Sequence, residues 1–381
     1  MSIIDYPLEN GLIQANAPIE VSHKTGHFWF PSLHKVGDNT LACSIVRSAD
    51  VAQGKWPAEL YLSTDVGASW KFDQAIDSYG HTSIRHNQTT TLMMPYELWP
   101  AAPDDNLNSA ASGNLLTLST KGTLTVETPN ITFCDFPAPL ATYHEDELFL
   151  HHIGNILHLP GGQLFTTLYG KFDGDTHFCS FAVVSNDGGF TWFFRSIIAT
   201  GDDVPEAPEG PNESDTQLLD NGDLICIYRV SSEREFYKSY SSDEGLTWST
   251  PMRLIGMRSV QPRLAKLGNG AIVLTGGRPG LFCWLNADGK GETWEQINLG
   301  THHNQLIETT EHQFPEAFCQ AEEAWEPYEK PSSSTAYTGI MPWGEDKVIV
   351  TYDRLSNGWS GAPGPNGKVD RVFSLSLKIS I

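Results

Sequence analysis

Glu213 and Arg229 are two residues whose types and spacing can support chemistry. They lie sixteen positions apart, one just before and one at the end of a predicted β-hairpin. The hairpin turns at Asn221-Gly222, a dipeptide that strongly favours a two-residue turn, and Leu224 to Val230 forms the returning strand. This hairpin brings a carboxylate and a guanidinium to the same end of its two strands. The pair is then either an ordinary buried salt bridge or part of a site that binds or transforms a ligand.

Titratable and aromatic residues also stand at the starts and ends of other predicted strands. The starts hold Trp29, His151, His152 and Tyr337, the ends hold Arg47, Tyr169 and Arg278, and Asp50 follows in a loop. Each has a structural alternative: a histidine at a strand start is more often structural than catalytic, both aromatic residues suit a core, and a loop carboxylate is often only solvated. Groups of these types that converge on one rim favour a functional site.

A turn motif recurs along the chain and predicts the elements that would position these residues. The pattern S-x-D-x-G-x-[ST]-W occurs at 63–70, 185–192 and 241–248, and a looser copy with one inserted residue occurs at 286–294. Its aspartate can accept backbone N–H groups of the turn, its glycine supplies a positive φ, and its tryptophan packs over a hairpin. Steps of about 45–55 residues between copies suit one four-stranded sheet per repeat. We expect these turns to be scaffold.

The motif resembles the Asp-box of the sialidase (neuraminidase) superfamily, and the resemblance covers most of the chain. It implies an all-β fold, a six-bladed β-propeller with Asp-box turns, in a single domain spanning 1–381 with an insertion between blades at about 299–333. We expect residues 1–26 to add strands that close the ring against the last blade. In that family the first-strand starts and second-strand ends surround the active face, and the Asp-box turns lie on the opposite face.

The same resemblance implies roles for the candidate residues. The Asn-Glu-Ser at 212–214, the Asn-Gly turn and the terminal Arg229 look like the sialidase motif that supplies the glutamate partner of the nucleophile and a clamping arginine. Tyr337 would then be the nucleophile and Glu213 the group that takes its proton. The remaining roles implied are acid for Asp50, pocket lining for Arg47, and binding of an anionic group for Arg229 with Arg278.

Trp29 is a departure from the family pattern, because it stands where sialidases have the first clamping arginine. A tryptophan offers a face on which a sugar can stack, and it removes a charge-assisted contact of about 1.5–3 kcal/mol. We therefore expect an exo-acting, sialidase-like glycoside hydrolase that acts on a sugar other than ordinary sialic acid. His151, His152 and Tyr169 would lie near the same face and contact the substrate.

Two other functions stay open at this point. A polysaccharide lyase acting on a uronic-acid glycan needs a cation, such as Arg229, and a His or Tyr to take a proton. The candidates for the proton acceptor are His151, His152, Tyr169 and Tyr228. A non-catalytic carbohydrate-binding propeller would use the same face without chemistry. In all three cases the partner is a glycan.

Composition narrows the remaining possibilities. The chain of 381 residues has 24 Lys and Arg against 46 Asp and Glu, a formal net charge of −22, which repels nucleic acid and anionic membranes. No apolar run approaches the roughly 18–20 residues that span a bilayer. No metal, cofactor or CxxC motif is present, so we expect buried free thiols. The N-terminus shows no leader, which favours a cytoplasmic protein, or a secreted or periplasmic one if a leader was removed.

Overall fold

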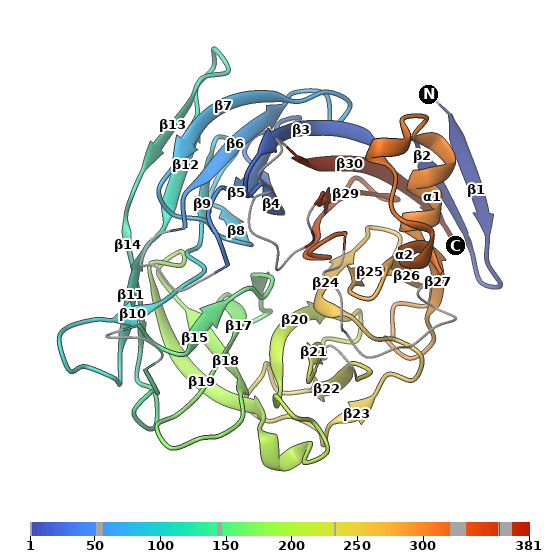
Figure 1. The fold of residues 1–381 in the computed structure, drawn as a ribbon. Coiled ribbons are helices and arrows are strands. Elements are labelled where there is room, and N and C mark those ends of the chain that lie inside the picture. Colours follow the sequence, from blue (N-terminus) through green and yellow to red (C-terminus); the bar gives the residue numbers. More distant parts are fainter. Residues whose placement is uncertain are drawn as a thin grey trace.

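Six β-sheets arranged around a central axis make up most of the protein (Figure 1). The structure, a computed structural model, describes residues 2–50, 56–142, 147–231, 234–320, 333–356, 358 and 368–381. We number the sheets 1 to 6 in the order in which their inner strands occur along the chain. The all-β class is confirmed: in the described residues only two short α-helices and two 3-10 turns interrupt the strands.

Four of the sheets contain four antiparallel strands each. Sheet 1 contains β4 (Trp29–Lys35), β5 (Leu41–Val46), β6 (Ala58–Ser63) and β7 (Lys71–Ile76). Sheet 2 contains β8 (Ser83–Arg85), β9 (Thr90–Met93), β12 (Asn114–Leu118) and β13 (Leu124–Glu127). Sheet 4 contains β20 (Asn212–Leu218), β21 (Leu224–Arg229), β22 (Tyr237–Ser241) and β23 (Met252–Arg253). Sheet 5 contains β24 (Val260–Lys266), β25 (Ile272–Gly277), β26 (Leu281–Asn286) and β27 (Glu295–Asn298).

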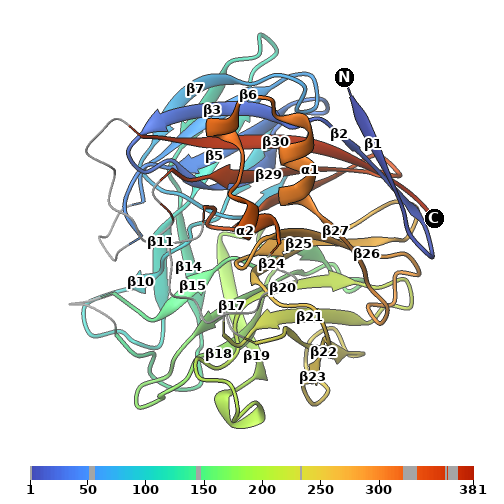
Figure 2. The same cartoon turned by 45° about the vertical axis from the view of Figure 1, so that its right-hand side comes forward.

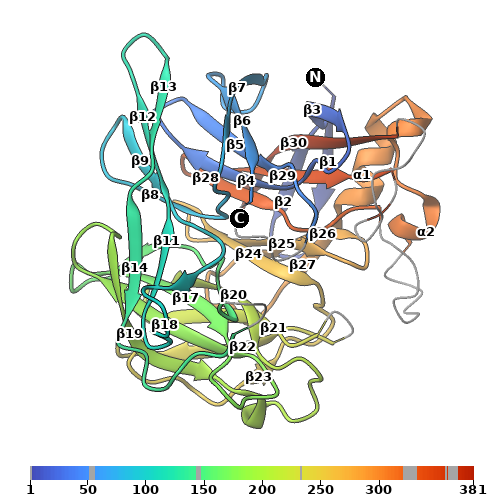
Figure 3. The same ribbon diagram turned by 60° about the vertical axis from the view of Figure 1, so that its left-hand side comes forward.

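Sheet 3 is wider than the others. Its body contains β15 (Leu150–His152), β16 (Leu157–His158), β17 (Leu164–Gly170), β18 (Cys179–Ser185) and β19 (Thr191–Ala199). Three further strands extend it, β10 (Trp99–Pro100), β11 (Ser109–Ser112) and β14 (Asn130–Cys134), and β14 pairs with β19 in parallel. Figure 3 shows this extension running beside sheet 2.

Sheet 6 joins the two ends of the chain. It contains β28 (Gly339–Trp343), β29 (Lys347–Arg354) and β30 (Val369–Ser380), together with β1 (Ile3–Pro7), β2 (Leu12–Asn16) and β3 (Ile19–Thr25). Both β2 and β3 pair with β30 in antiparallel register, for example Ile13 with Ile379. The expectation that the first residues close the ring is therefore confirmed.

The hydrophobic core is divided among the interfaces between neighbouring sheets. The buried apolar residues of the described chain form six clusters, and each cluster fills the space between one pair of adjacent sheets, including sheets 6 and 1. This explains why middle strands such as β5, β18 and β25 are buried along their whole length. Because such strands are covered on both faces, their sequences are nearly continuous runs of apolar residues.

The four recurring aspartate turns have the geometry that their sequence predicts. In the turn at 241–248, Ser241 Oγ donates to Asp243 Oδ1 at 2.8 Å, and the same oxygen accepts the Thr247 N–H at 2.9 Å. The turns at 63–70 and 185–192 repeat both contacts, and Asn286 replaces the serine in the looser copy.

The glycine of each aspartate turn packs against the preceding sheet of the ring. A Cβ atom on Gly245, whose φ is +81°, would lie 2.6 Å from the Phe165 ring. The corresponding contacts of Gly67, Gly189 and Gly291 are with Ile349, Ile84 and Ile225. Gly67 of sheet 1 thus meets sheet 6, and the four turns together join four of the six pairs of neighbouring sheets.

The insertion after sheet 5 contains α1 (Leu299–Leu306), a 3-10 turn (Thr310–His312) and α2 (Glu316–Cys319), and a second 3-10 turn lies at Gly201–Asp203. Both helices lie on the outer side of the ring (Figure 2). His302 hydrogen-bonds Tyr6 at 2.9 Å and His303 hydrogen-bonds Tyr352 at 2.9 Å, so these buried histidines fix α1 to sheet 6. Within the described residues, no helix has the length and apolarity required to span a membrane.

Candidate active site

Tyr337, Glu213 and Arg229 form a hydrogen-bonded group near the axis. The Tyr337 hydroxyl donates to Glu213 Oε1, and Arg229 Nη1 donates to the same oxygen at 2.7 Å. Arg229 Nη2 also pairs with Glu209 at 3.0 Å. Glu213 lies on β20, Arg229 ends β21, and Tyr337 precedes β28, so three predicted site residues from sheets 4 and 6 meet here.

The electrostatics of this group keep a carboxylate next to a protonated phenol. Burial alone raises the pKa of Glu213, but Arg229, Tyr337 and the Gln261 N–H favour the carboxylate more strongly, and the net pKa lies below its usual value. Burial and the Glu213 charge raise the pKa of Tyr337 well above its usual value. The guanidinium of Arg278 lies 5.3 Å from the centre of the Tyr337 ring and opposes that shift.

A repeated bulge at the start of the inner strand positions several of these residues. Glu213, Gln261 and Phe30 have positive φ angles of 41°, 35° and 51°, and each lies at a register shift in its hairpin. A bulge re-aims side chains and leaves a backbone N–H without a ladder partner. Here Glu213 Oε2 accepts the Gln261 N–H at 2.8 Å, and Asp353 Oδ2 accepts the Phe30 N–H at 3.1 Å. Strained residues of this kind, at about 1–3 kcal/mol each, concentrate at functional sites.

Asp353 holds the segment that leads to Tyr337. Its buried carboxylate accepts Ser334 Oγ at 2.8 Å, the Thr335 N–H at 2.7 Å and the Thr335 hydroxyl. Ala336 follows with a φ of 59°, and Arg278 donates to Thr335 O at 2.9 Å. The tyrosine is thus fixed through its backbone as well as its hydroxyl.

A small cavity of about 10 Å³, room for about one water molecule and here called the Tyr337 cavity, lies beside the phenol. It is lined by Phe30, Asp50, Trp56, His81, Tyr96 and Tyr337. Asp50 lines this cavity although it is exposed as a whole residue. Burial raises the pKa of Asp50, Arg278 opposes the change, and the Glu213 charge adds to it. Asp50 is therefore placed with Tyr337 and is biased toward holding a proton.

His151 and Tyr169 lie on the same side of the group. Tyr169 Oη is 3.3 Å from Tyr96 Oη, and the His151 ring lies 4.9 Å from Tyr169 and stacks on Tyr96 at 5.3 Å. Burial lowers the pKa of His151 to about 4, despite the attraction of Glu213, so its imidazole is neutral at pH 7. His151 Nδ1 has no hydrogen-bond partner among the described residues.

Three predicted site residues are not brought to this group. Trp29 is only 3% exposed and donates its indole N–H to Ser48 O at 2.9 Å, so its face is not available to a sugar here. The bulge turns Phe30 toward Tyr337 instead, with ring centres 4.9 Å apart. Arg47 binds His27 O at 2.9 Å and pairs with Glu59. His152 is fully buried against Phe133 and hydrogen-bonds Thr166.

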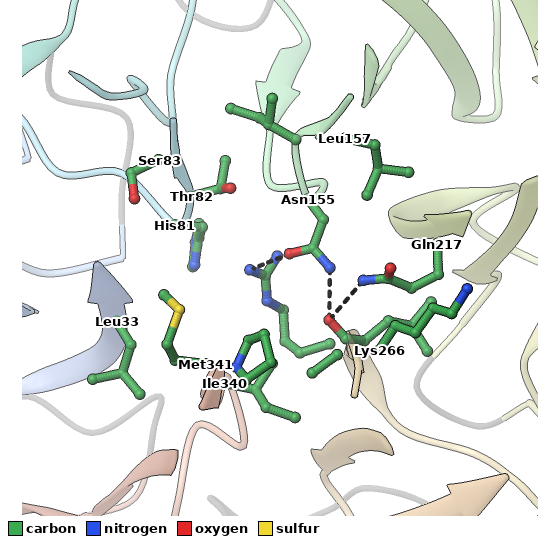
Figure 4. A pocket seen from close by; sticks show the side chains of 15 residues that line it. Leu33, His81, Thr82, Ser83, Asn155, Leu157, Gln217, Lys266, Ile340 and Met341 are labelled. Atoms are coloured by element: carbon green, nitrogen blue, oxygen red, sulfur yellow. Dashed lines mark hydrogen bonds between the residues drawn. The ribbon is translucent and has the colours of Figure 1, made fainter. Parts of the chain in front are cut away.

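A second cavity of about 270 Å³ lies along the axis, between the middle parts of the inner strands (Figure 4). Asn155 and Gln217 point toward its wall, where both amides donate to Leu264 O. Arg263 is fixed there by Ile153 O and Asn155. His81 lines both this cavity and the Tyr337 cavity, and its Nδ1 meets Gln261 Nε2 at 2.8 Å.

Sequence reasoning missed several residues of the site. His81 precedes β8 and Tyr96 follows β9, and their sheet 2 has no aspartate turn to set its register. Trp56, like Asp50, lies between β5 and β6. Tyr96 does follow the end of the second strand of its sheet, a position expected at this face. In the described residues no cluster of His, Cys, Asp and Glu is arranged to hold a metal. The six cysteines are free thiols, and four of them are buried.

No protein-family model matches the sequence. No curated protein matches it either. Several solved structures do resemble the fold. A protein of Dyadobacter fermentans DSM 18053, described as of unknown function, aligns with a TM-score of 0.64 and 15% identity over 98% of this chain and 100% of its own.

Glycoside hydrolases are among the similar structures, and two of them illustrate the likeness. An α-L-arabinanase of Penicillium chrysogenum, solved with arabinobiose, aligns with a TM-score of 0.55 and 14% identity over 94% of this chain and 98% of its own. A mutant of the NanB sialidase from Streptococcus pneumoniae aligns with a TM-score of 0.51 and 12% identity over 92% of this chain and 68% of its own. At these identities the likeness establishes a shared, β-propeller-like fold, and the named activities are those of the other proteins.

Proposed function

We propose that the protein is an exo-acting glycoside hydrolase of sialidase-like type, built as one six-bladed β-propeller domain with Asp-box turns. The observation that supports it most is the contact of Tyr337 with Glu213, flanked by Arg229 and Arg278. The likeness to glycoside hydrolases of the same fold adds to it.

In this mechanism Tyr337 is the nucleophile. The phenol is protonated at rest, because its pKa is raised. As its oxygen bonds to the anomeric carbon, the oxygen loses electron density and its proton passes to the Glu213 carboxylate. Arg229 and Arg278 stabilise the negative charge during the transfer. Glu213, held ionised by its partners, is available as the acceptor.

Asp50 supplies the proton that the leaving group needs. Its carboxyl lines the Tyr337 cavity, and its raised pKa favours the protonated form. The glycosidic oxygen takes this proton while the C–O bond breaks, and water, deprotonated by Asp50, later releases the sugar from Tyr337. The overall reaction is hydrolysis with retention of configuration.

The substrate proposed is a sugar other than ordinary sialic acid. Trp29 replaces a clamping arginine, and the other arginines are already engaged: Arg229 by two glutamates, Arg278 by Thr335 O, and Arg47 by Glu59. An acidic sugar would have to compete for these cations within a protein of net charge −22. Exo action is part of the proposal and follows from the resemblance of the sequence motifs.

A lyase is the second candidate, and His151 is the observation that favours it. Its neutral imidazole, with Nδ1 unpartnered among the described residues and Tyr169 beside it, can take a proton from carbon. The engaged arginines weigh against this function, because a uronate must be neutralised. A non-catalytic carbohydrate-binding propeller would give the contact between the Tyr337 phenol and the Glu213 carboxylate no chemical role.

The test is a panel of 4-nitrophenyl glycosides, neutral oligosaccharides and acidic polysaccharides, with wild type, Tyr337→Phe and Glu213→Gln. Release of a reducing end by wild type, lowered at least about 10²-fold in both variants, supports the proposal. Products with unsaturated-uronate absorbance indicate the lyase. If Tyr337→Phe is as active as wild type, Tyr337 is not the nucleophile; absence of turnover with retained glycan affinity indicates a binding protein.

A further inference from the structure

Gln261 connects the Glu213 carboxylate to the interior of the ring. Its backbone N–H donates to Glu213 Oε2 at 2.8 Å, and its side chain is fully buried. The residue has a positive φ of 35° and lies at the register shift between β24 and β25. A residue other than glycine keeps such a conformation only where its surroundings fix it. The position of the Glu213 carboxylate therefore depends on what holds Gln261.

His81 is the hydrogen-bond partner of the Gln261 side chain. The amide Nε2 of Gln261 lies 2.8 Å from His81 Nδ1, across 180 residues of sequence. An amide nitrogen can only donate, so Nδ1 accepts, and the neutral imidazole carries its proton on Nε2. The neutral state agrees with the surroundings of His81, which is 4% exposed: burial, and next the charge of Arg263, lower its pKa well below the usual value. The contact is thus a buried hydrogen bond with a defined direction.

Aromatic rings fix the imidazole in this orientation. The centre of the His81 ring lies 4.8 Å from that of Tyr79 and 5.1 Å from that of Tyr96, and both contacts are edge-on. Tyr79 is itself fixed, because its hydroxyl donates to Phe30 O at 2.6 Å. The Tyr337 ring lies 6.1 Å from the His81 ring, and the cavity that both line has room for about one water molecule. We therefore assign His81 an effect on the site through its protein contacts and no contact with the sugar.

We propose that His81 is a positioning residue for the Glu213 carboxylate. By accepting the hydrogen bond of the Gln261 side chain, it keeps the backbone N–H of that residue directed at Glu213 Oε2. The proposal rests on the proposed function, in which Glu213 takes the proton of Tyr337. A misplaced acceptor disturbs this transfer, and a displacement of about 1 Å can lower turnover about 10²-fold.

Two substitutions separate the hydrogen bond of His81 from its packing. His81→Phe keeps a ring among the neighbouring tyrosines and removes the acceptor. His81→Asn removes the ring and keeps an acceptor, because the amide oxygen, like Nδ1, is two bonds from Cβ. With the 4-nitrophenyl glycoside that wild type cleaves fastest, we expect kcat to fall about 10–10²-fold in His81→Phe, with little change in KM. His81→Asn should recover most of this loss. A side chain that only fills space gives the opposite order, so that order, or equal kcat values in the two variants, overturns the proposal.

Gln261→Met tests the other end of the same hydrogen bond. Methionine keeps the side-chain length and the N–H to Glu213 but has no amide to bind His81. We expect it to lower kcat as much as His81→Phe does, and the double variant to lose no more than either single one. Losses that multiply in the double variant contradict the proposal. Should His81→Phe fail to fold, Gln261→Met compared with His81→Asn replaces it.

His302→Phe is the matched control for replacing a buried histidine. His302 is also fully buried, but it hydrogen-bonds Tyr6 at 2.9 Å on the outer side of the ring. The substitution should leave kcat unchanged. A fall in kcat equal to that of His81→Phe means that any buried histidine has this effect, and the proposal is then wrong.

A measurement without substrate separates this proposal from the proposed function. The ¹⁵N resonances of labelled histidine report which ring nitrogen carries the proton, and comparison with His81→Asn identifies the signals of His81. We expect a neutral ring protonated at Nε2 in wild type at pH 7. A ring protonated at Nδ1, or at both nitrogens, overturns the proposal even if glycosides are cleaved.

Unfolding in urea gives a second readout that needs no activity. The loss in midpoint caused by His81→Phe should shrink when Glu213→Gln is already present, because the two residues act through Gln261. The loss caused by His302→Phe should not depend on Glu213→Gln. Strictly additive losses for the His81 and Glu213 variants refute the connection. If these results hold and no glycoside is cleaved, the proposed function fails while the positioning of Glu213 by His81 stands.

Discussion

The Tyr337 hydroxyl and the Glu213 carboxylate meet across 124 residues of sequence, and they do so at a carboxylate that three sheets share. Glu213 Oε1 accepts from Tyr337 of the sheet 6 connection and from Arg229 of sheet 4, and its Oε2 accepts the Gln261 N–H of sheet 5. One buried side chain therefore links the backbone of the ring to the proposed nucleophile. Structural and chemical roles coincide at this residue, and they have to be separated by experiment.

Arg229→Met tests the structural role of this carboxylate. The substitution leaves Glu213 buried with one partner fewer, and we expect the free energy of unfolding in urea to fall by roughly 3–5 kcal/mol. Adding Glu213→Gln removes the uncompensated charge and should restore part of the loss. Arg253→Met is the control, because its ion pair with Glu235 at 2.8 Å is largely exposed and should contribute about 0–1 kcal/mol. Strictly additive effects of the two site substitutions would contradict the coupling.

Asp353→Asn tests whether the position of Tyr337 depends on the buried carboxylate behind it. The amide keeps one acceptor but turns an NH₂ group toward donors of Ser334, Thr335 or Phe30. We expect unfolding free energy to fall by about 1–3 kcal/mol. We also expect kcat to fall with little change in KM, because the nucleophile moves while the sugar contacts remain. Asp346→Asn, at an exposed pair with Lys378, is the control; a change in KM alone would argue against a positioning role.

The aspartate turns predict how the stability of the protein depends on pH. Hydrogen bonds from the Thr247 side chain and backbone lower the pKa of Asp243 to about 2. Because this pKa is lowered in the folded state, ionised Asp243 stabilises the protein above pH about 4, the ordinary pKa of an aspartate. This stabilisation is lost as the pH falls toward 2. Asp243→Asn should therefore flatten the loss of thermal stability between pH 4 and 2 and leave turnover at neutral pH unchanged. Parallel melting curves for wild type and variant would refute this, and Asp220→Asn, at an exposed site, should behave as wild type.

The sequence predicted the contact at the centre of the site but not the conformation around it. Turn motifs and hairpin signals were local enough to place Glu213, Arg229 and Tyr337 at one end of their strands. The bulges could not be recognised from the sequence. A register shift of one residue exchanges the side chains on the two faces of a strand. That is why Phe30 reaches Tyr337 while Trp29 is buried. Sheet 2 has an inner strand of three residues and no aspartate turn, so Tyr96 and His81 could not be placed.

Asp50 predicts the shape of the pH–activity profile. As the acid it works only when protonated, so kcat/KM should fall as pH rises through its raised pKa. Glu213 must be ionised, so activity should fall at the acid end, below the usual carboxyl range because its pKa is lowered. Asp50→Asn should remove the alkaline limb and lower kcat/KM by about 10²–10⁴-fold for glycosides with alkyl leaving groups. Glycosides of 4-nitrophenol, whose leaving group needs no proton at neutral pH, should be affected far less. An equal loss for both kinds of leaving group, measured across pH 4–9, would exclude Asp50 as the acid, while Asp220→Asn, at an exposed ion pair with Lys266, should retain both limbs of the profile.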